Sequence, residues 1–239
     1  MRKSSKKIGL TMIKLLNQNN LPAVKESFDL IYADMIYENT ELSWMYYWWK
    51  NLKPNSIFIV QTDWHTLKNV WTMFDFLPGS NFINHLVWKN EWGNFPKRKF
   101  HQVHDDILVF SNGENYKFYP DRIQVPKATA KTNLNPSGRQ TKTATSWIDN
   151  ICLTTTSNER VKLPSGKLIR WQKPVKLFDL IVKPFTDECD LVGDIFMGSG
   201  SLGVWSKLNK RNYIGIEFDT EVFNLAQERL NKTADFIGE

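Results

Sequence analysis

The sequence has little cysteine and no long apolar run. Its 239 residues include only Cys152 and Cys189, too few for a disulfide framework or a cysteine-based zinc site. The apolar stretches 57–60 and 107–110 are far shorter than the ~18 residues that cross a bilayer. The basic start at 1–7 is not followed by the apolar block of a signal peptide. We therefore expect a cytoplasmic protein that does not insert into a membrane.

The composition is that of a folded, basic chain. Lys and Arg number 31 against 25 Asp and Glu, which gives a net charge of +6, and 41% of the residues are hydrophobic. This length and composition indicate one globular domain with room for an insertion. Ten tryptophans are many for a chain with a pI near 9.2, because such rings fill cores but also stack on unpaired bases. Both uses remain open from composition alone.

Short apolar runs alternate with helical patterns, which predicts an α/β fold with a mostly parallel sheet. The five aromatic residues at 44 and 46–49 cannot share one face of a helix, so only part of this set is expected in the core. The expected helices are 8–17, 41–52, 65–76, 176–182, 202–209 and 220–232, with a turn at 53–55. The expected strands are 28–33, 56–61, 82–88, 106–110, one leading into 194–196, and 212–218.

The stretch 112–170 differs from the rest of the chain. It is polar, has no sustained period, and contains ten Lys and Arg against four Asp and Glu, a net charge of +6. A basic insertion of this kind suits contact with nucleic acid phosphates, although most charged stretches are only solvated faces. The chain is therefore divided into 1–111, an insertion at 112–170, and 171–239.

A glycine loop at 194–203 reads DIFMGSGSLG, and Gly198, Gly200 and Gly203 stand between an expected strand and an expected helix. Such glycines let the backbone approach a ligand, and Glu217 at the end of the next strand could bind ribose hydroxyls. The alternatives are a tight turn beside a surface glutamate, or a nicotinamide dinucleotide site. The second is disfavoured because only 36 residues follow Gly203, too few for another βαβ half.

Three segments together resemble the amino-group DNA methyltransferases of the β group. The segment 194–219 resembles their D-P-F-x-G-S-G-T and I-G-I-E motifs, and Gln172-Lys173-Pro174-Val175 resembles their Q-K-P-V. Asp34-Met35-Ile36-Tyr37 stands where their catalytic D-P-P-Y belongs, without its two prolines. The resemblance implies a Rossmann-like S-adenosylmethionine-dependent fold with helices on both sheet faces. It makes 1–111 the catalytic half, 112–170 the target-recognition region and 171–239 the cofactor-binding half.

The resemblance also implies roles for single residues. Asp34 would accept hydrogen bonds from the target amine, and Tyr37 would stack on a base flipped out of the duplex. Met35 and Ile36 would supply the backbone between them. The residues implied in binding S-adenosylmethionine are Asp194, Phe196, Gly198, Ser199, Gly200, Ser201, Glu217 and Lys173, the last near the methionine carboxylate together with the two serines.

Double-stranded DNA is the implied partner. Lys97, Arg98 and Lys99, near Trp88 and Trp92, are candidate contacts, and so are Lys131, Arg139 and Lys142 of the insertion. No metal is implied, because His101 and His104 lack further ligands at typical spacing and fit a strand start better.

The implied activity is methylation of an exocyclic amine in a specific DNA sequence, as in restriction-modification, with N6 of adenine preferred. The alternatives are N4 of cytosine, a catalytically silent DNA-binding or partner subunit, and an RNA amino-methyltransferase. A homodimer or a partner subunit also remains open.

Overall fold

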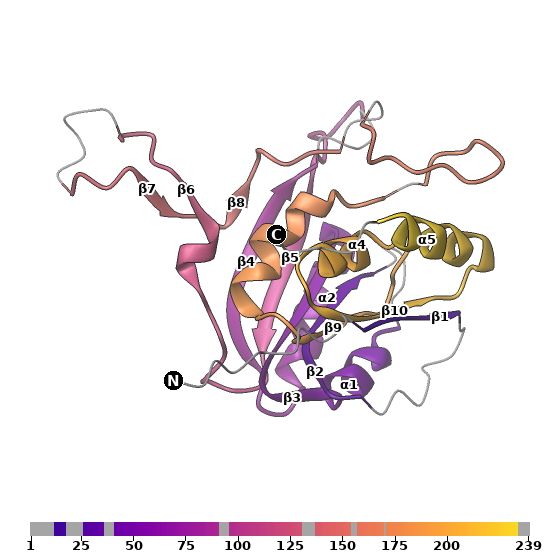
Figure 1. Ribbon diagram of the computed structural model, residues 1–239. Coiled ribbons are helices and arrows are strands. Elements are labelled where there is room, and N and C mark those ends of the chain that lie inside the picture. Colours follow the sequence, from indigo (N-terminus) through magenta and orange to yellow (C-terminus); the bar gives the residue numbers. More distant parts are fainter. Residues whose placement is uncertain are drawn as a thin grey trace, which may run out of the picture.

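The computed structural model describes residues 12–17, 26–35, 41–90, 96–130, 137–153, 157–169 and 171–233. An eight-stranded sheet in the order β1-β10-β9-β2-β3-β5-β4-β8 forms its centre (Figure 1). The pairings from β1 to β3 are parallel, whereas β5 runs antiparallel to both β3 and β4. The strands are β1 (Ile13–Asn17), β2 (Phe28–Asp34), β3 (Leu52–Thr62), β4 (Asn81–Lys89), β5 (His104–Ser111), β8 (Trp147–Ile148), β9 (Leu191–Asp194) and β10 (Asn212–Glu217).

Helices cover both faces of the sheet, which confirms the predicted fold class. Helices α1 (Ser43–Trp49) and α2 (Trp64–Asp75) pack on one face, and α3 (Phe178–Ile181), α4 (Ser201–Leu208) and α5 (Thr220–Lys232) on the other. Short 3₁₀ helices occur at η1 (Pro120–Ile123), η2 (Val175–Leu177) and η3 (Lys183–Phe185). The carboxylates of Asp63 and Asp219 cap α2 and α5 by accepting main-chain N–H bonds of the first turn, a standard helix-start signal.

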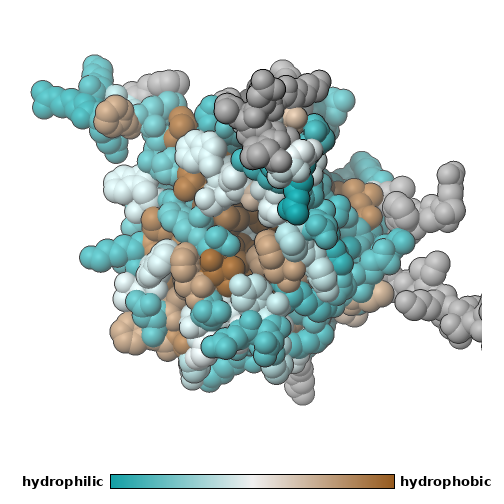
Figure 2. All heavy atoms as spheres, turned by 90° about the vertical axis from the view of Figure 1, so that its left-hand side faces the viewer, coloured by the Kyte–Doolittle hydropathy of each residue, from teal (hydrophilic) through white to brown (hydrophobic). Residues whose placement is uncertain are grey.

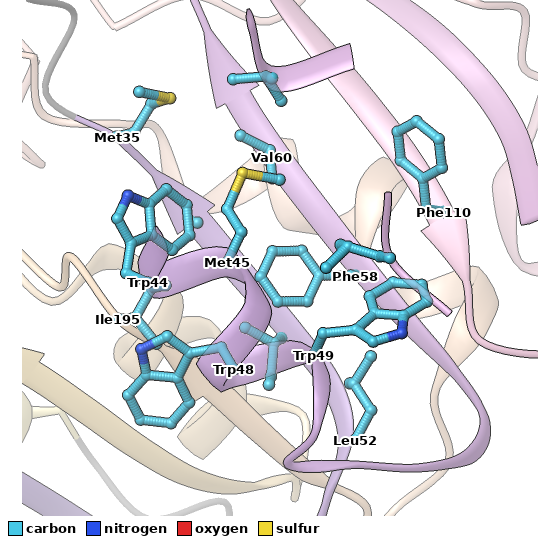
Figure 3. Close-up of a cluster of buried hydrophobic side chains, with 14 of the residues drawn as sticks. Met35, Trp44, Met45, Trp48, Trp49, Leu52, Phe58, Val60, Phe110 and Ile195 are labelled. Atoms are coloured by element: carbon cyan, nitrogen blue, oxygen red, sulfur yellow. The ribbon is translucent and has the colours of Figure 1, made fainter. Parts of the chain in front are cut away.

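The buried strands alternate between two cores because successive side chains point to opposite faces. In β3, Phe58 and Val60 face α1 and α2, and Ile57 and Ile59 face the opposite layer. Figure 3 shows the first core, with Met35 and Trp44 at one edge and Phe110 at the other. Of the aromatic set in α1, Trp44, Trp48 and Trp49 are buried, whereas Tyr46 is exposed. The expectation that only part of this set is core is confirmed.

The helix expected at 8–17 is wrong over its described part. Residues 13–17 form the edge strand β1, which pairs in parallel with β10 from Ile13↔Tyr213 to Asn17↔Glu217. The main-chain oxygen of Met12 also accepts a 2.8 Å hydrogen bond from the Tyr213 amide. A run of five residues is too short for its own helical propensity to compete with sheet hydrogen bonds, so tertiary pairing decides its structure.

Several element boundaries also differ from expectation. The turn expected at 53–55 lies inside β3, where Asn55 adopts a left-handed φ of 59° and marks an irregularity in the strand. Helix α1 covers 43–49 only, and the helix expected at 176–182 is split between η2 and α3. Strand β9 leads into Asp194 as expected, and residues 195–200 form the turn before α4.

The insertion contains regular structure that its sequence pattern does not indicate. Strands β6 (Gln124–Pro126) and β7 (Thr141–Thr143) form an antiparallel ribbon that projects from the body (Figure 1). Strand β8 joins the main sheet beside β4. Figure 2 shows the molecule from the left-hand side of Figure 1. This face has a hollow near its centre, and hydrophobic residues border the hollow.

Candidate active site

Three acidic side chains lie at the carboxyl ends of neighbouring strands, which form one edge of the sheet. Parallel strands β10, β9 and β2 are neighbours and end at Glu217, Asp194 and Asp34. The chain leaves β9 towards β10 on one side, through α4, and leaves β2 towards β3 on the other, through α1. Ligands of α/β sheets bind at such a reversal, outside the carboxyl ends of the strands. The region outside the carboxyl ends of β9 and β2, called the crevice below, is therefore the candidate site.

The glycine loop after β9 lines this crevice. Gly198 and Gly200 have positive φ values of 51° and 73°, and α4 begins at Ser201 directly after them. A Cβ at Gly198 would meet nothing within 4 Å, so this part of the loop borders open space. The Gly198 amide donates a 2.8 Å hydrogen bond to Glu217 Oε2, and burial raises the pKa of the Glu217 carboxyl.

An arginine that the sequence patterns did not single out supports the same loop. Arg229 of α5 donates from Nη1 to the Ser199 carbonyl at 3.1 Å and to Ser201 Oγ at 2.9 Å. Its Nη2 lies 3.3 Å from Glu159 Oε1, and burial lowers the pKa of the guanidinium. Because Glu159 belongs to the insertion, Arg229 links the glycine loop to that segment. In the sequence it reads as an ordinary basic residue near a helix end.

Asp194 has one satisfied and one unsatisfied oxygen. Its Oδ2 accepts a 3.0 Å hydrogen bond from the Tyr213 hydroxyl, whereas the buried Oδ1 has no hydrogen-bond partner within the described part of the chain. Burial raises the pKa of Asp194 to about 8, against the opposing effect of the Tyr213 hydrogen bond. An orphaned buried carboxylate oxygen at this edge is an open acceptor for a polar or cationic ligand group.

Asp34 is paired with a buried lysine. Lys173 Nζ lies 2.5 Å from Asp34 Oδ2 and also donates to the Trp171 carbonyl at 3.1 Å. Burial raises the pKa of Asp34 to about 6, although the Lys173 ammonium opposes this. Its second oxygen, Oδ1, is buried and has no hydrogen-bond partner in the described residues. Lys173, expected near a cofactor carboxylate, thus has its ammonium on the expected catalytic acid.

The chain after Asp34 is held without the two prolines of the family motif. The Met35 amide donates a 3.2 Å hydrogen bond to the Gln61 carbonyl at the end of β3, and the Met35 side chain is buried. Proline would lack this donor. Here the donor is satisfied by the neighbouring strand, so β2 continues its sheet pairing one residue past Asp34.

The sequence reasoning did not identify a polar network beside this ion pair. Gln61 accepts a 2.7 Å bond from the Tyr32 hydroxyl and donates one of 2.7 Å to Asp105 Oδ2, while Asn90 donates to Asp105 Oδ1 at 2.7 Å. Asp105 reaches this edge because β5 is antiparallel to β3, so its beginning lies beside the end of β3. A sequence motif does not reveal the direction in which a neighbouring strand runs, so it could not place Asp105 beside Asp34.

The other expected site residues have the following positions. Phe196 is half-buried and packs edge-on against Trp44 with ring centroids 5.1 Å apart. Trp88 is buried and donates through Nε1 to the Ile151 carbonyl, so it belongs to the core. Exposed positions are occupied by Lys97, Arg98, Lys99, Arg139 and Lys142, and Lys99 lies over the Trp64 ring. Ile36, Tyr37, Trp92 and Lys131 lie outside the described residues.

His104 begins β5, as expected from the strand reading. Within the described ranges, no group of three or more His, Cys, Asp or Glu side chains is arranged to hold a metal ion. The helices of these ranges are also too short or too polar to span a bilayer.

Comparisons with known proteins agree with this fold. A family model described as DNA methylase matches residues 24–228. The type II methyltransferase M.HpaI of Haemophilus parainfluenzae is 25% identical over 242 residues, covering 91% of this chain and 74% of that protein. M1.MboII of Moraxella bovis is 29% identical over 167 residues, which are 64% of each chain.

Solved structures show the same architecture. The crystal structure of an M1.HpyAVI-SAM complex superposes with a TM-score of 0.68 and 23% identity, covering 92% of this chain and 100% of that one. At this identity the likeness is one of fold.

Proposed function

This chain belongs to the DNA methylase family, and from that premise we propose that it transfers a methyl group from S-adenosylmethionine to an exocyclic amine in duplex DNA, with N6 of adenine as the preferred target. One observation carries the proposal. Asp34, whose buried Oδ1 has no hydrogen-bond partner among the described residues, ends the strand next to β9, and the end of β9 leads into the glycine loop. A carboxylate acceptor and a nucleoside-binding loop therefore share one crevice.

The residues of the crevice fit S-adenosylmethionine. Glu217 is proposed to bind the ribose hydroxyls, and Gly198 leaves room for a ligand beside the backbone, whereas Gly200 allows the loop to pack closely against α5. The Asp194 Oδ1, which has no hydrogen-bond partner among the described residues, suits the cofactor's amino group. Phe196 offers an aromatic face for the adenosine. Ser199 and Ser201 are proposed near the methionine carboxylate, where the buried Arg229 adds positive charge. When bound, the cofactor supplies an electrophilic methyl group on its sulfonium.

Asp34 would act on the target amine. An exocyclic amine is a weak nucleophile because its lone pair is delocalised into the ring. A carboxylate that accepts a hydrogen bond from the amine N–H favours a geometry in which the nitrogen lone pair is less conjugated with the ring. The same carboxylate can take the proton that methylation releases. Asp34 Oδ1 is the atom we assign to both tasks. Ile36 and Tyr37 are proposed to complete the base pocket, with Tyr37 stacking on the flipped base.

DNA contact is proposed for two sets of basic residues. Lys97, Arg98 and Lys99 form one exposed cluster. In the insertion, Lys142 lies on β7 of the ribbon, and Lys131 and Arg139 lie between the two ribbon strands in the sequence. A two-stranded ribbon is narrow enough to enter a DNA major groove. We therefore propose 112–170 as the target-recognition region, between a catalytic half at 1–111 and a cofactor-binding half at 171–239.

Adenine is preferred over cytosine because the motif begins with Asp34 and ends with Tyr37, whereas a serine-initiated motif would favour cytosine. The two reactions need the same acceptor and the same cofactor. The methylated base must therefore be identified by analysis of the reaction product, because the site geometry does not distinguish adenine from cytosine.

The test is methylation with isotopically labelled S-adenosylmethionine and mixed-sequence duplex DNA, followed by digestion and mass spectrometry of the nucleosides. We expect labelled N6-methyladenine. The variant Asp34→Ala should lose transfer but retain cofactor binding by calorimetry, and Asp75→Ala, an exposed acid on α2, should retain both.

Other outcomes would change the assignment. Labelled N4-methylcytosine would move the target to cytosine. A parallel reaction with RNA in place of DNA tests the substrate, and label in that reaction alone would reassign it to RNA. Cofactor binding without any label would indicate a catalytically silent subunit.

A further inference from the structure

Lys173 is shared between two carboxylates. Its ammonium is 2.5 Å from Asp34 Oδ2 on one side and 3.8 Å from Asp105 Oδ2 on the other, and all three side chains are buried or nearly so. One cation therefore serves two anions in a site that excludes most water. If either carboxylate were neutralised, the ammonium would still have a counter-ion within reach.

Asp105 is held in place by two side-chain amides. Its two oxygens accept hydrogen bonds from Asn90 and Gln61, and Gln61 is itself oriented by the Tyr32 hydroxyl. Asp34 differs, because its Oδ1 is buried without a partner in the described chain. Of the two acids, Asp34 is the one with an oxygen free to receive a proton.

Lys173 also has space beside it. Asn90, Asp105, Trp171 and Lys173 line a pocket together with Trp88 and Arg160. Trp171 adopts a left-handed φ of 62°, which is uncommon for a bulky residue, and its carbonyl accepts a hydrogen bond from the Lys173 ammonium. This acceptor lies only two residues before Lys173 in the chain, so it can stay with the ammonium during a small shift.

We propose that Asp105 is a positioning residue that takes over the Lys173 ammonium when Asp34 accepts the proton of the target amine. This proposal rests on the proposed methyl transfer. One proton moves from the amine nitrogen to Asp34 Oδ1, which neutralises Asp34. The ammonium then pairs with Asp105, so the site keeps one cation and one anion and no buried charge is left without a partner.

The titratable groups near Asp34 set the expected pH behaviour. They are Lys173, Asp105 and, on the neighbouring strand β9, Asp194, and Arg160 lines the same pocket as Asp105 and Lys173. The Asp105 charge raises the pKa of Asp34 and the Lys173 charge lowers it. Asp105 therefore makes Asp34 a better proton acceptor. Removing the Asp105 charge should move the acid limb of the pH–rate profile to lower pH, and removing the Lys173 charge should move it to higher pH.

The experiment measures single-turnover methylation of duplex DNA against pH. For Asp105→Asn we expect the rate to fall by roughly tenfold to a hundredfold, less than the ~10²–10⁴-fold contributed by a group that transfers the proton itself, because Asp105 acts only through Lys173. The acid limb should move to lower pH, whereas in Lys173→Gln it should move to higher pH. Asp105→Glu should recover part of the rate. Cofactor affinity, measured by calorimetry, should be unchanged in Asp105→Asn.

The matched control is Asp106→Asn. Asp106 is the next residue of β5, is equally buried, and pairs with His85 at 2.7 Å away from the crevice. It should keep the wild-type rate and acid limb. A carbon-13 titration of the Asp34 carboxyl provides a readout independent of activity, and its midpoint should fall in Asp105→Asn.

The possible results separate the two proposals. Wild-type rate and an unmoved acid limb in Asp105→Asn, from an active wild type, would overturn the role of Asp105 alone. A lowered rate with an unmoved limb and midpoint would also overturn it, because that pattern is what a merely structural role gives. A wild type that methylates no base would overturn the proposed function and this role with it.

Discussion

The main-chain amide of Gly198 donates a 2.8 Å hydrogen bond to Glu217 Oε2, across nineteen residues of sequence. The other oxygen of Glu217 accepts a 2.9 Å bond from the Asp219 amide, directly before α5. The carboxylate thus joins the turn after β9 to the end of β10. It fixes the shape of the glycine loop as well as offering an acceptor for a ligand.

Replacing Glu217 by alanine should weaken binding of S-adenosylmethionine by ~10- to 100-fold, because hydrogen bonds to a charged group contribute about 1.5–3 kcal/mol. Isothermal calorimetry measures the dissociation constant. Glu221→Ala, at an exposed position of α5, is the control and should bind normally. Equal affinity in the two variants would remove Glu217 from the cofactor site.

Asp194 should make the ligand-free protein less stable as the pH rises. Its folded-state pKa is about 8, above the ordinary value of 3.8, so the folded chain holds a proton that the unfolded chain has lost. Stability from this group is complete below about pH 4 and is lost as the pH rises through about 8, by at most ~1.4 kcal/mol per pH unit. Asp194→Asn cannot ionise and should lose this dependence.

Urea unfolding at pH 5.5, 7 and 8.5 measures that difference. The free energy of unfolding of Asp194→Asn should rise relative to the wild type with each step in pH. Asp75→Asn, an exposed change on α2, should follow the wild-type curve. Parallel curves for the wild type and Asp194→Asn would show that Asp194 is ionised at neutral pH.

Helix α4 lies too close to β10 for a side chain at Gly203. A Cβ there would be 2.8 Å from Tyr213 Cε1 and 3.0 Å from Leu230 Cδ2. Gly203→Ala should therefore lower the free energy of unfolding by ~1–3 kcal/mol, the cost of overpacking a core. Three residues along the same helix, the buried Ser206 hydroxyl has no hydrogen-bond partner within the described residues.

Ser206→Ala is thus a matched variant of α4 that should be neutral or stabilising, because it removes an unsatisfied polar group. Thermal and urea unfolding of both variants test the pair. Similar losses in Gly203→Ala and Ser206→Ala would mean that α4 tolerates neither change, and that the close approach at Gly203 is not the cause.

The exposed cluster at Lys97–Lys99 should contribute to DNA affinity through phosphate contact. Arg98→Ala should weaken binding to duplexes of different sequence alike and lower the slope of log K against log salt by about 0.9 for one lost phosphate contact. Fluorescence anisotropy at several salt concentrations gives the slope. Lys68→Ala, at an exposed position of α2, should leave the slope unchanged. An unaltered slope in Arg98→Ala would place this residue outside the DNA surface.

Most of the sheet could be predicted because its strands carry strong local signals. Buried runs such as 28–33 and 212–218 are apolar, and the helix at 220–232 has a capping Asp219 and a clear period. Glu217 was placed at its strand end by spacing alone. The N-terminal strand was missed because five residues do not define a period, and the pairing that forms β1 comes from β10, almost 200 residues away.

The amino-acid sequence by itself determined the fold class, the family motifs and three of the acidic strand ends, since each depends on residues close together in the chain. Only the tertiary structure showed that Lys173 contacts Asp34, that Arg229 supports the glycine loop, and that Asp105 reaches the same edge. These contacts join segments up to 139 residues apart, and the last depends on β5 running antiparallel to β3. Chain direction and register within a sheet follow from the packing of the whole domain, which no local pattern records.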